Sequence, residues 1–228
     1  ARVPSGLQRE AIELKPTDRP MIYRNFLEGL SPRGIAVGFR EKVHFAWDAE
    51  HMTPRLIWHG AFIDASKHWV DRGPGNQTPL GDHIMTLPAG PPLAQLPSLD
   101  QPWPDKLPRE HGFRFQGYRL SAEGIPTFRY QMGSISVEDF IQPLESTPDN
   151  GLERKMTFRS DAPVKDLFVR LAVGREVEES SDAVTIDGVR FETDGVTPVI
   201  RTSNGQSELL LPISWQGDHA SLVVRLRW

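Results

Sequence analysis

The chain has 228 residues, no cysteine, and 30 acidic against 26 lysine and arginine side chains, giving a formal net charge of -4. The missing cysteines exclude disulfides, thiolate catalysis and covalent c-type haem attachment within these residues. The charges are interspersed without a basic patch, so no nucleic-acid partner is predicted. No apolar run reaches the roughly 20 residues of a membrane-spanning helix, so no membrane span is predicted.

The first half of the chain is predicted to form short strands. Twenty prolines and nineteen glycines argue against long helices, because a proline inside a helix costs about 3 kcal/mol. One short helix is predicted near residues 5–14. Elsewhere apolar and polar side chains alternate with a period of two, the pattern of β-strands. Such strands are predicted over residues 21–26, 34–39, 42–49 and 55–64.

A proline-rich segment follows at residues 74–108, which hold nine prolines. Proline cannot donate to a sheet ladder, so this density excludes a central strand. Apolar side chains nevertheless continue through the segment, among them Ile84, Leu93 and Trp103. We therefore predict a long ordered loop packed on the body of the protein, with a flexible linker as the alternative.

The alternating pattern resumes beyond residue 112 and continues to the end of the chain. Its apolar phase shifts after Gly117, which indicates a β-bulge. Asp187-Gly188 and Asn204-Gly205 predict tight two-residue hairpins. About a dozen strands with such turn spacing predict an all-β fold. We expect one domain spanning residues 1–228, a large antiparallel β-sandwich of the supersandwich or jelly-roll type.

The stretch from Arg55 to Gly75, RLIWHGAFIDASKHWVDRGPG, gathers two residues each of tryptophan, histidine, aspartate and arginine. This mixture suits a sugar, because an indole stacks on a pyranose face while charged groups hydrogen-bond to its hydroxyls. The predicted ligand-binding residues are Trp58, Asp64, Trp69 and Arg72. In the alternative interpretation the tryptophans belong to the core, Asp64 caps a turn and Arg72 pairs with a carboxylate.

Two further groups of residues are weaker candidates for a functional site. Asp48, Glu50 and His51 are close enough to offer metal ligands, but tight sites draw further ligands from elsewhere, so no metal site is predicted. A glycosidase needs two carboxyl groups roughly 5–10 Å apart. Asp64 could act as the acid or base, with Asp48, His51 or Asp71 as its partner. Acids are plentiful in the chain, and a structural role for each of them is the alternative.

The run YRNFLEGLSPRGIAVGFREKVHFAWDAEHMTPRLIWHGAFIDASKHWVDRG and the later GFRFQGYRLSAEGIPTFRY resemble a β-rich domain of large secreted bacterial proteins. Those proteins also carry sorbosone-dehydrogenase-like propellers and c-type cytochrome modules. The resemblance covers roughly residues 20 to 130. It implies a periplasmic or secreted location and a neighbour that handles sugars or electrons, and it supplies no catalytic residues.

Three functions are therefore open. The first is a non-catalytic accessory module or subunit of an exported sugar-oxidising or electron-transfer system, without a cofactor, that binds carbohydrate or docks a c-type cytochrome or dehydrogenase module. The second is a sugar-active enzyme with Asp64 as acid or base. The third is a subunit that holds haem without a covalent link, through histidine or methionine. In that case the axial ligand is expected among His44, His51, His59 and His68.

Overall fold

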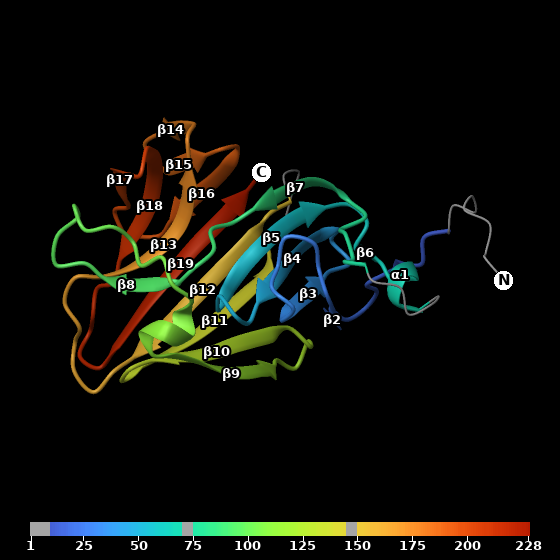
Figure 1. The fold of residues 1–228 in the computed structure, drawn as a ribbon, viewed down its shortest axis with the longest axis horizontal. Coiled ribbons are helices and arrows are strands. Elements are labelled where there is room, and N and C mark those ends of the chain that lie inside the picture. The colour runs from blue at the N-terminus through green and yellow to red at the C-terminus, as the bar shows by residue number, and fades with distance from the viewer. Residues whose placement is uncertain (1–9, 70–74, 145–149) are drawn as a thin grey trace.

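The computed structural model describes residues 10–69, 75–144 and 150–228. Strands hold 53 % of the residues and helices 4 %, which confirms the predicted all-β class. The strands form an antiparallel sandwich without a closed barrel (Figure 1). Apart from the one-turn helix α1 (Ser66–Trp69) and the 3-10 turn η1 (Pro108–His111), the described chain consists of strands and their connections. None of its helices has the length and apolar character needed to cross a membrane.

One layer of the sandwich is an eight-stranded sheet in which every pair of neighbours is antiparallel. Its strands, in spatial order, are β14 (Val177–Glu179), β15 (Ala183–Ile186), β16 (Val189–Thr193), β19 (His219–Arg227), β12 (Leu152–Arg159), β11 (Ile135–Pro143), β10 (Pro126–Met132) and β9 (Phe113–Leu120).

The other layer consists of two smaller sheets. The four-stranded sheet has the order β17 (Val199–Ser203), β18 (Gln206–Pro212), β13 (Leu167–Gly174) and β8 (Leu93–Gln95). The five-stranded sheet has the order β2 (Met21–Arg24), β3 (Gly34–Gly38), β4 (Val43–Asp48), β5 (Thr53–His59) and β7 (Asp82–Thr86). A separate pair, β1 (Glu13–Leu14) and β6 (Ile63–Asp64), accompanies the five-stranded sheet.

The main core lies between these two layers. Trp47 of β4 stacks on Phe128 of β10 with ring centroids 4.3 Å apart, which joins the five-stranded sheet to the eight-stranded sheet. Val169 and Leu211 bring the four-stranded sheet into the same buried cluster. Because both smaller sheets contribute to one continuous cluster, they act together as one layer. Each buried side chain of this size stabilises the fold by roughly 1.5–3 kcal/mol.

The five-stranded sheet is buried on its second face as well. All six residues of β4 are buried, including the outward-facing His44 and Ala46. Leu14 of β1 and Ile63 of β6 pack there against Trp58 of β5 in a second hydrophobic cluster. The pair β1–β6 therefore covers a face that a simple two-layer sandwich leaves in water.

The local turn signals are confirmed, and one helix prediction is wrong. Asp187 and Gly188 both have positive φ, 46° and 85°, and join β15 to β16 as a hairpin. Asn204 and Gly205 do the same between β17 and β18. The predicted bulge is a register shift between β9 and β10 near Gly117. Of the helix expected near residues 5–14, residues 5–9 lie outside the described residues, and Glu13–Leu14 is the strand β1.

The second half of the proline-rich segment packs on the four-stranded sheet, where Leu96 and Trp103 join Leu210 in a small cluster apart from the main core. Residue 74 lies outside the described residues; the remainder differs from the predicted loop because it contributes the edge strands β7 and β8. Trp103 is buried, and its indole N–H donates to the Pro91 carbonyl at 2.8 Å. Arg201 of β17 donates to the carbonyls of Leu99 and Gln101 at 2.7 and 2.6 Å. These bonds fasten the segment to the sheet.

Arg201→Ala is expected to loosen this segment and to lower the free energy of unfolding by about 2–4 kcal/mol. It removes the charge-assisted hydrogen bonds to the segment and the buried pair of Arg201 with Glu208, although Glu208 keeps its pair with Arg170. Limited proteolysis should then cut between residues 96 and 106 sooner than in the unaltered protein. Arg119→Ala is the matched control, because Arg119 pairs with Glu138 on the exposed surface. Equal cleavage rates in both variants would show that Arg201 does not hold the segment.

Candidate functional site

Trp58 is a core residue, so the prediction that it lines an exposed contact surface is wrong. The predicted strand 55–64 breaks at Gly60, where φ is 85°. The chain then folds back, and Phe62 stacks on Trp58 with ring centroids 5.9 Å apart. The indole N–H of Trp58 donates to the carbonyls of Ala61 and Phe62, both at 3.1 Å. With 0 % of its surface exposed, Trp58 cannot touch a ligand in this structure.

Asp64 holds the turn between β6 and α1. One carboxylate oxygen accepts the backbone N–H groups of Ile12 and Ser66, at 2.9 and 2.8 Å. The other accepts the Ser66 hydroxyl at 3.0 Å. Burial raises the pKa of Asp64, but the hydrogen bonds from Ser66 and Ile12 and the charge of Lys67 bring it below its ordinary value. A general acid must hold a proton near neutral pH, so this geometry favours the turn-capping interpretation.

Asp48 and His51 are likewise engaged in local structure. The buried carboxylate of Asp48 accepts the N–H and hydroxyl of Ser31, at 2.7 and 2.6 Å, and the N–H of Glu50 at 2.9 Å. His51 accepts the Gly90 N–H through Nδ1 at 2.9 Å, and burial lowers its pKa. Among the described residues no group of three or more histidine, aspartate or glutamate side chains is placed to hold a metal.

The histidines expected to ligate haem have other contacts. Nδ1 of His44 accepts the Phe39 N–H and its Nε2–H donates to the Gly60 carbonyl, so iron would displace one of these bonds. Nε2 of His68 donates to the Gly75 carbonyl at 2.9 Å. The His59 ring packs on Trp228 with centroids 4.3 Å apart. None of these arrangements favours an axial ligand.

Trp69 belongs to an exposed group of aromatic rings, which we call the aromatic corner: Tyr23, Phe26, His68 and Trp69. The side chains of Phe26 and Trp69 are 52 % and 61 % exposed. The Phe26 ring lies 6.1 Å from the ring of His68, which precedes Trp69 on α1. The Trp69 side chain lies near the Tyr23 hydroxyl, which accepts a hydrogen bond from Nδ2 of Asn25 at 2.6 Å. These contacts hold both exposed rings in one region.

Backbone hydrogen bonds fix the segments that carry the aromatic corner. Phe26 accepts the Gln77 N–H at 2.7 Å, and the Gln77 carbonyl accepts the Glu28 N–H at 2.8 Å. Trp69 donates its N–H to the Ala65 carbonyl at 3.1 Å within α1. Asp64, which holds the start of α1, is therefore a positioning residue for Trp69. Arg72, the fourth predicted ligand-binding residue, lies outside the described residues.

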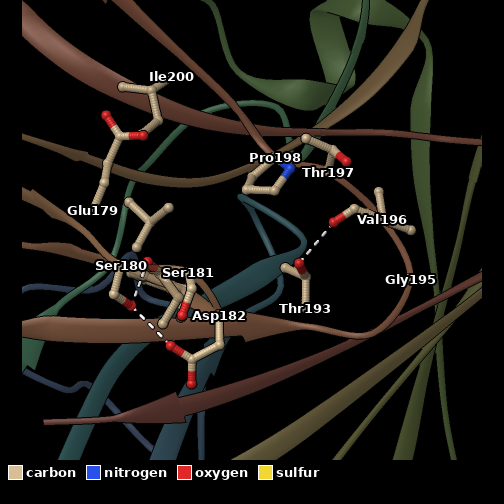
Figure 2. Close-up of a pocket in the computed structure, with 13 residues that line it drawn as sticks. Glu179, Ser180, Ser181, Asp182, Thr193, Gly195, Val196, Thr197, Pro198 and Ile200 are labelled. Carbon is tan, nitrogen blue, oxygen red and sulfur yellow. Dashed lines mark hydrogen bonds between the residues drawn. The ribbon is translucent and has the colours of Figure 1, made fainter.

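A second feature, which we call the intersheet cleft, is a hollow of about 610 Å³ between the eight-stranded and four-stranded sheets. Its rim comes from the β14–β15 turn and from the link between β16 and β17 (Figure 2). Its apolar lining includes the half-buried Val196, Pro198 and Ile200 and the buried Val184 and Phe191. The cleft cannot be predicted from the sequence, because the two polar segments at its rim come together only when the two sheets pack.

Comparison with known proteins gives no matching family model, no similar curated protein and no similar solved structure. The resemblance to an exported bacterial domain therefore stays a prediction. The aromatic corner and the intersheet cleft are the features of the described residues that bear on function.

Proposed function

We propose that this chain is a non-catalytic β-sandwich module that binds carbohydrate at the aromatic corner, as part of an exported sugar-oxidising or electron-transfer system. One observation supports the proposal above all. Phe26 and Trp69 each expose more than half of their surfaces, and Phe26 lies beside the ring of His68, which directly precedes Trp69. Asp48 and Asp64, in contrast, are engaged in structural hydrogen bonds. The protein thus offers rings for stacking rather than a carboxyl pair for catalysis.

The exposed rings match the apolar face of a pyranose. If a sugar covers about 100 Å² of aromatic surface, burial contributes about 2.5 kcal/mol. Hydrogen bonds from the rim, where Lys67 and Glu28 are exposed, add about 1 kcal/mol each. Affinities in the millimolar to high micromolar range are therefore expected, because a Kd of 1 mM corresponds to about 4 kcal/mol.

Trp69→Ala is expected to weaken oligosaccharide binding at the aromatic corner at least tenfold, because it removes the larger stacking ring. Phe26→Ala should weaken it less. Leu120→Ala is the matched control, since Leu120 is 57 % exposed on β9 and is not part of the corner. Binding is measured by calorimetry against a panel of soluble plant and bacterial oligosaccharides, and thermal melting checks that each variant is folded.

Two results would contradict this assignment. One is an absence of binding across the panel, or binding that neither aromatic substitution changes. The other is glycoside turnover that Asp64→Asn abolishes while α1 stays folded, which would favour the sugar-active enzyme. A purified c-type cytochrome added in place of sugar tests the docking alternative with the same variants.

A further inference from the structure

The intersheet cleft has the size of a ligand site and lies far from the aromatic corner. Its volume of about 610 Å³ falls in the range of roughly 300–1,000 Å³ found for small-molecule pockets. In Figure 1 the strands β14, β15 and β17 that border it lie at one end of the long axis, and α1 lies toward the other. Whatever binds in the cleft therefore binds independently of Trp69.

Two of the four hydroxyl groups that line the cleft, those of Ser180 and Thr193, are committed as donors, so these two can only accept from a ligand. The Ser180 hydroxyl donates to Asp182 Oδ1 at 2.9 Å or to the Ala183 carbonyl at 3.2 Å. The Thr193 hydroxyl donates to the Val196 carbonyl at 2.7 Å. Figure 2 shows the bonds from Ser180 to Asp182 and from Thr193 to Val196 along the rim. A hydroxyl has one proton to donate and two lone pairs that can accept. In Ser180 and Thr193 the proton is already donated within the protein, so only the lone pairs remain for a ligand.

Two carboxylates add further acceptors. The Glu179 side chain makes no hydrogen bond or ion pair with any described residue. Asp182 is held by Arg190 at 2.9 Å, and the bonds from Ser180 and Arg190 lower its pKa, so it stays ionised. No lysine, arginine or histidine is among the described residues that line the cleft. The two carboxylates and the two committed hydroxyls therefore favour a ligand that brings donors.

The apolar part of the lining restricts the ligand further. The half-buried Val196, Pro198 and Ile200 can receive only an apolar face, while the carboxylates of the rim favour hydrogen-bond donors. A pyranose has both features, with C–H groups on its face and hydroxyl groups around its edge. A sugar that carries a carboxylate would be repelled by Glu179 and Asp182. We propose that the intersheet cleft is a second carbohydrate site, selective for uncharged sugars over uronic acids.

The cleft is tested by NMR titration of the full chain with the methyl glycosides of glucose, galactose and mannose, and with methyl glucuronide as the charged counterpart. Amide shifts of residues 179–184 and 193–200 report the cleft, and those of residues 23–28 and 64–69 report the aromatic corner. At least one neutral glycoside is expected to shift the cleft signals and to bind at least tenfold tighter than the glucuronide.

Glu179→Gln is expected to weaken the neutral glycoside about fivefold, because it replaces a charge-assisted acceptor by a neutral one. It should also reduce the discrimination against the glucuronide. Glu178→Gln is the matched control, since neighbouring residues of β14 point to opposite faces of the sheet. Trp69→Ala should leave the cleft titration unchanged, so a failure at the aromatic corner is distinguishable from a failure here.

Three outcomes would overturn the inference. The first is that none of the neutral glycosides shifts the cleft signals. The second is that the glucuronide binds as tightly as they do. The third is that methylamine, a protonated amine without hydroxyls, shifts the same signals more strongly than any glycoside, which would make the cleft a cation site.

Discussion

Replacing Asp139 by alanine is expected to lower the free energy of unfolding by about 3–5 kcal/mol, the cost of leaving a buried charge without its partner. Asp139 on β11 is 0 % exposed and faces the core. Arg154 on the neighbouring strand β12 donates Nε to its Oδ1 at 3.0 Å and Nη2 to its Oδ2 at 2.6 Å. Without the carboxylate, the guanidinium would stay buried between the sheets.

The residues around this pair offer little to replace the Asp139 carboxylate as the partner of Arg154. Burial raises the pKa of Asp139, although Arg154 draws it down, and the two-pronged geometry is that of an ionised pair. The charges of Asp139 and Arg154 both act on the nearby Tyr130 side chain, but the Tyr130 hydroxyl has no hydrogen-bond partner among the described residues. The Arg154 side chain therefore has no second acceptor of comparable strength.

The double variant Asp139→Leu/Arg154→Met separates charge pairing from packing. It removes both charges together, so it is expected to stay within about 2 kcal/mol of the unaltered protein or to exceed its stability. Glu138→Ala is the surface control and should change stability by at most about 1 kcal/mol, because its pair with Arg119 is solvent-exposed. Urea unfolding at pH 7 measures all three. A single variant more stable than the double variant would refute the argument.

The position of Asp139 shows what alternation along a strand can and cannot predict. In β11 the inward residues are Ile135, Val137, Asp139 and Ile141, so the sequence pattern places this acid toward the core. Its partner depends on the register of β11 against β12, which sets Asp139 opposite Met156 and brings Arg154 to the diagonal position. Register between strands is a property of the packed sheet and is not encoded in either strand alone.

The same limit explains the error at Trp58. Alternation correctly indicates that Leu56 and Trp58 share a face of β5. It does not tell whether that face meets water or protein. Here β1 and β6 cover it, because the chain reverses at Gly60 instead of continuing as one strand. Composition predicts Trp69 as a contact residue, whereas Phe26 is brought to the adjacent His68 by tertiary contacts from a distant part of the sequence.

His44 is expected to make the fold lose stability as the pH falls from about 6.5 toward 4. The side chain is 1 % exposed. Nδ1 accepts the Phe39 N–H at 3.1 Å and Nε2–H donates to the Gly60 carbonyl at 2.9 Å, so the folded protein needs the neutral ring. Burial lowers the pKa of His44 from 6.5 to about 4; the Gly60 carbonyl and Glu41 oppose this shift, and His59 adds to it.

The sign and size of the effect follow from proton linkage. The unfolded chain takes up a proton near pH 6.5, while the folded protein resists it until about pH 4. The stabilisation is therefore complete above pH 6.5 and is lost on acidification between these two values. At about 1.4 kcal/mol per pKa unit, it amounts to roughly 3 kcal/mol.

Urea unfolding at pH 7.5 and pH 4.5 measures this change in the unaltered protein and in His44→Gln, which cannot titrate. The variant is expected to be less stable at pH 7.5 but to lose about 2–3 kcal/mol less on acidification, so the two stabilities converge. Burial also lowers the pKa values of His51 and His59. Both histidines are present in the unaltered protein and in His44→Gln, so their contributions cancel when the two stability losses are compared. His219→Gln replaces an exposed histidine and is the control for the substitution itself. Equal losses in His44→Gln and the unaltered protein would mean that the buried ring titrates normally, so the hydrogen bonds to Phe39 and Gly60 could not be holding it neutral.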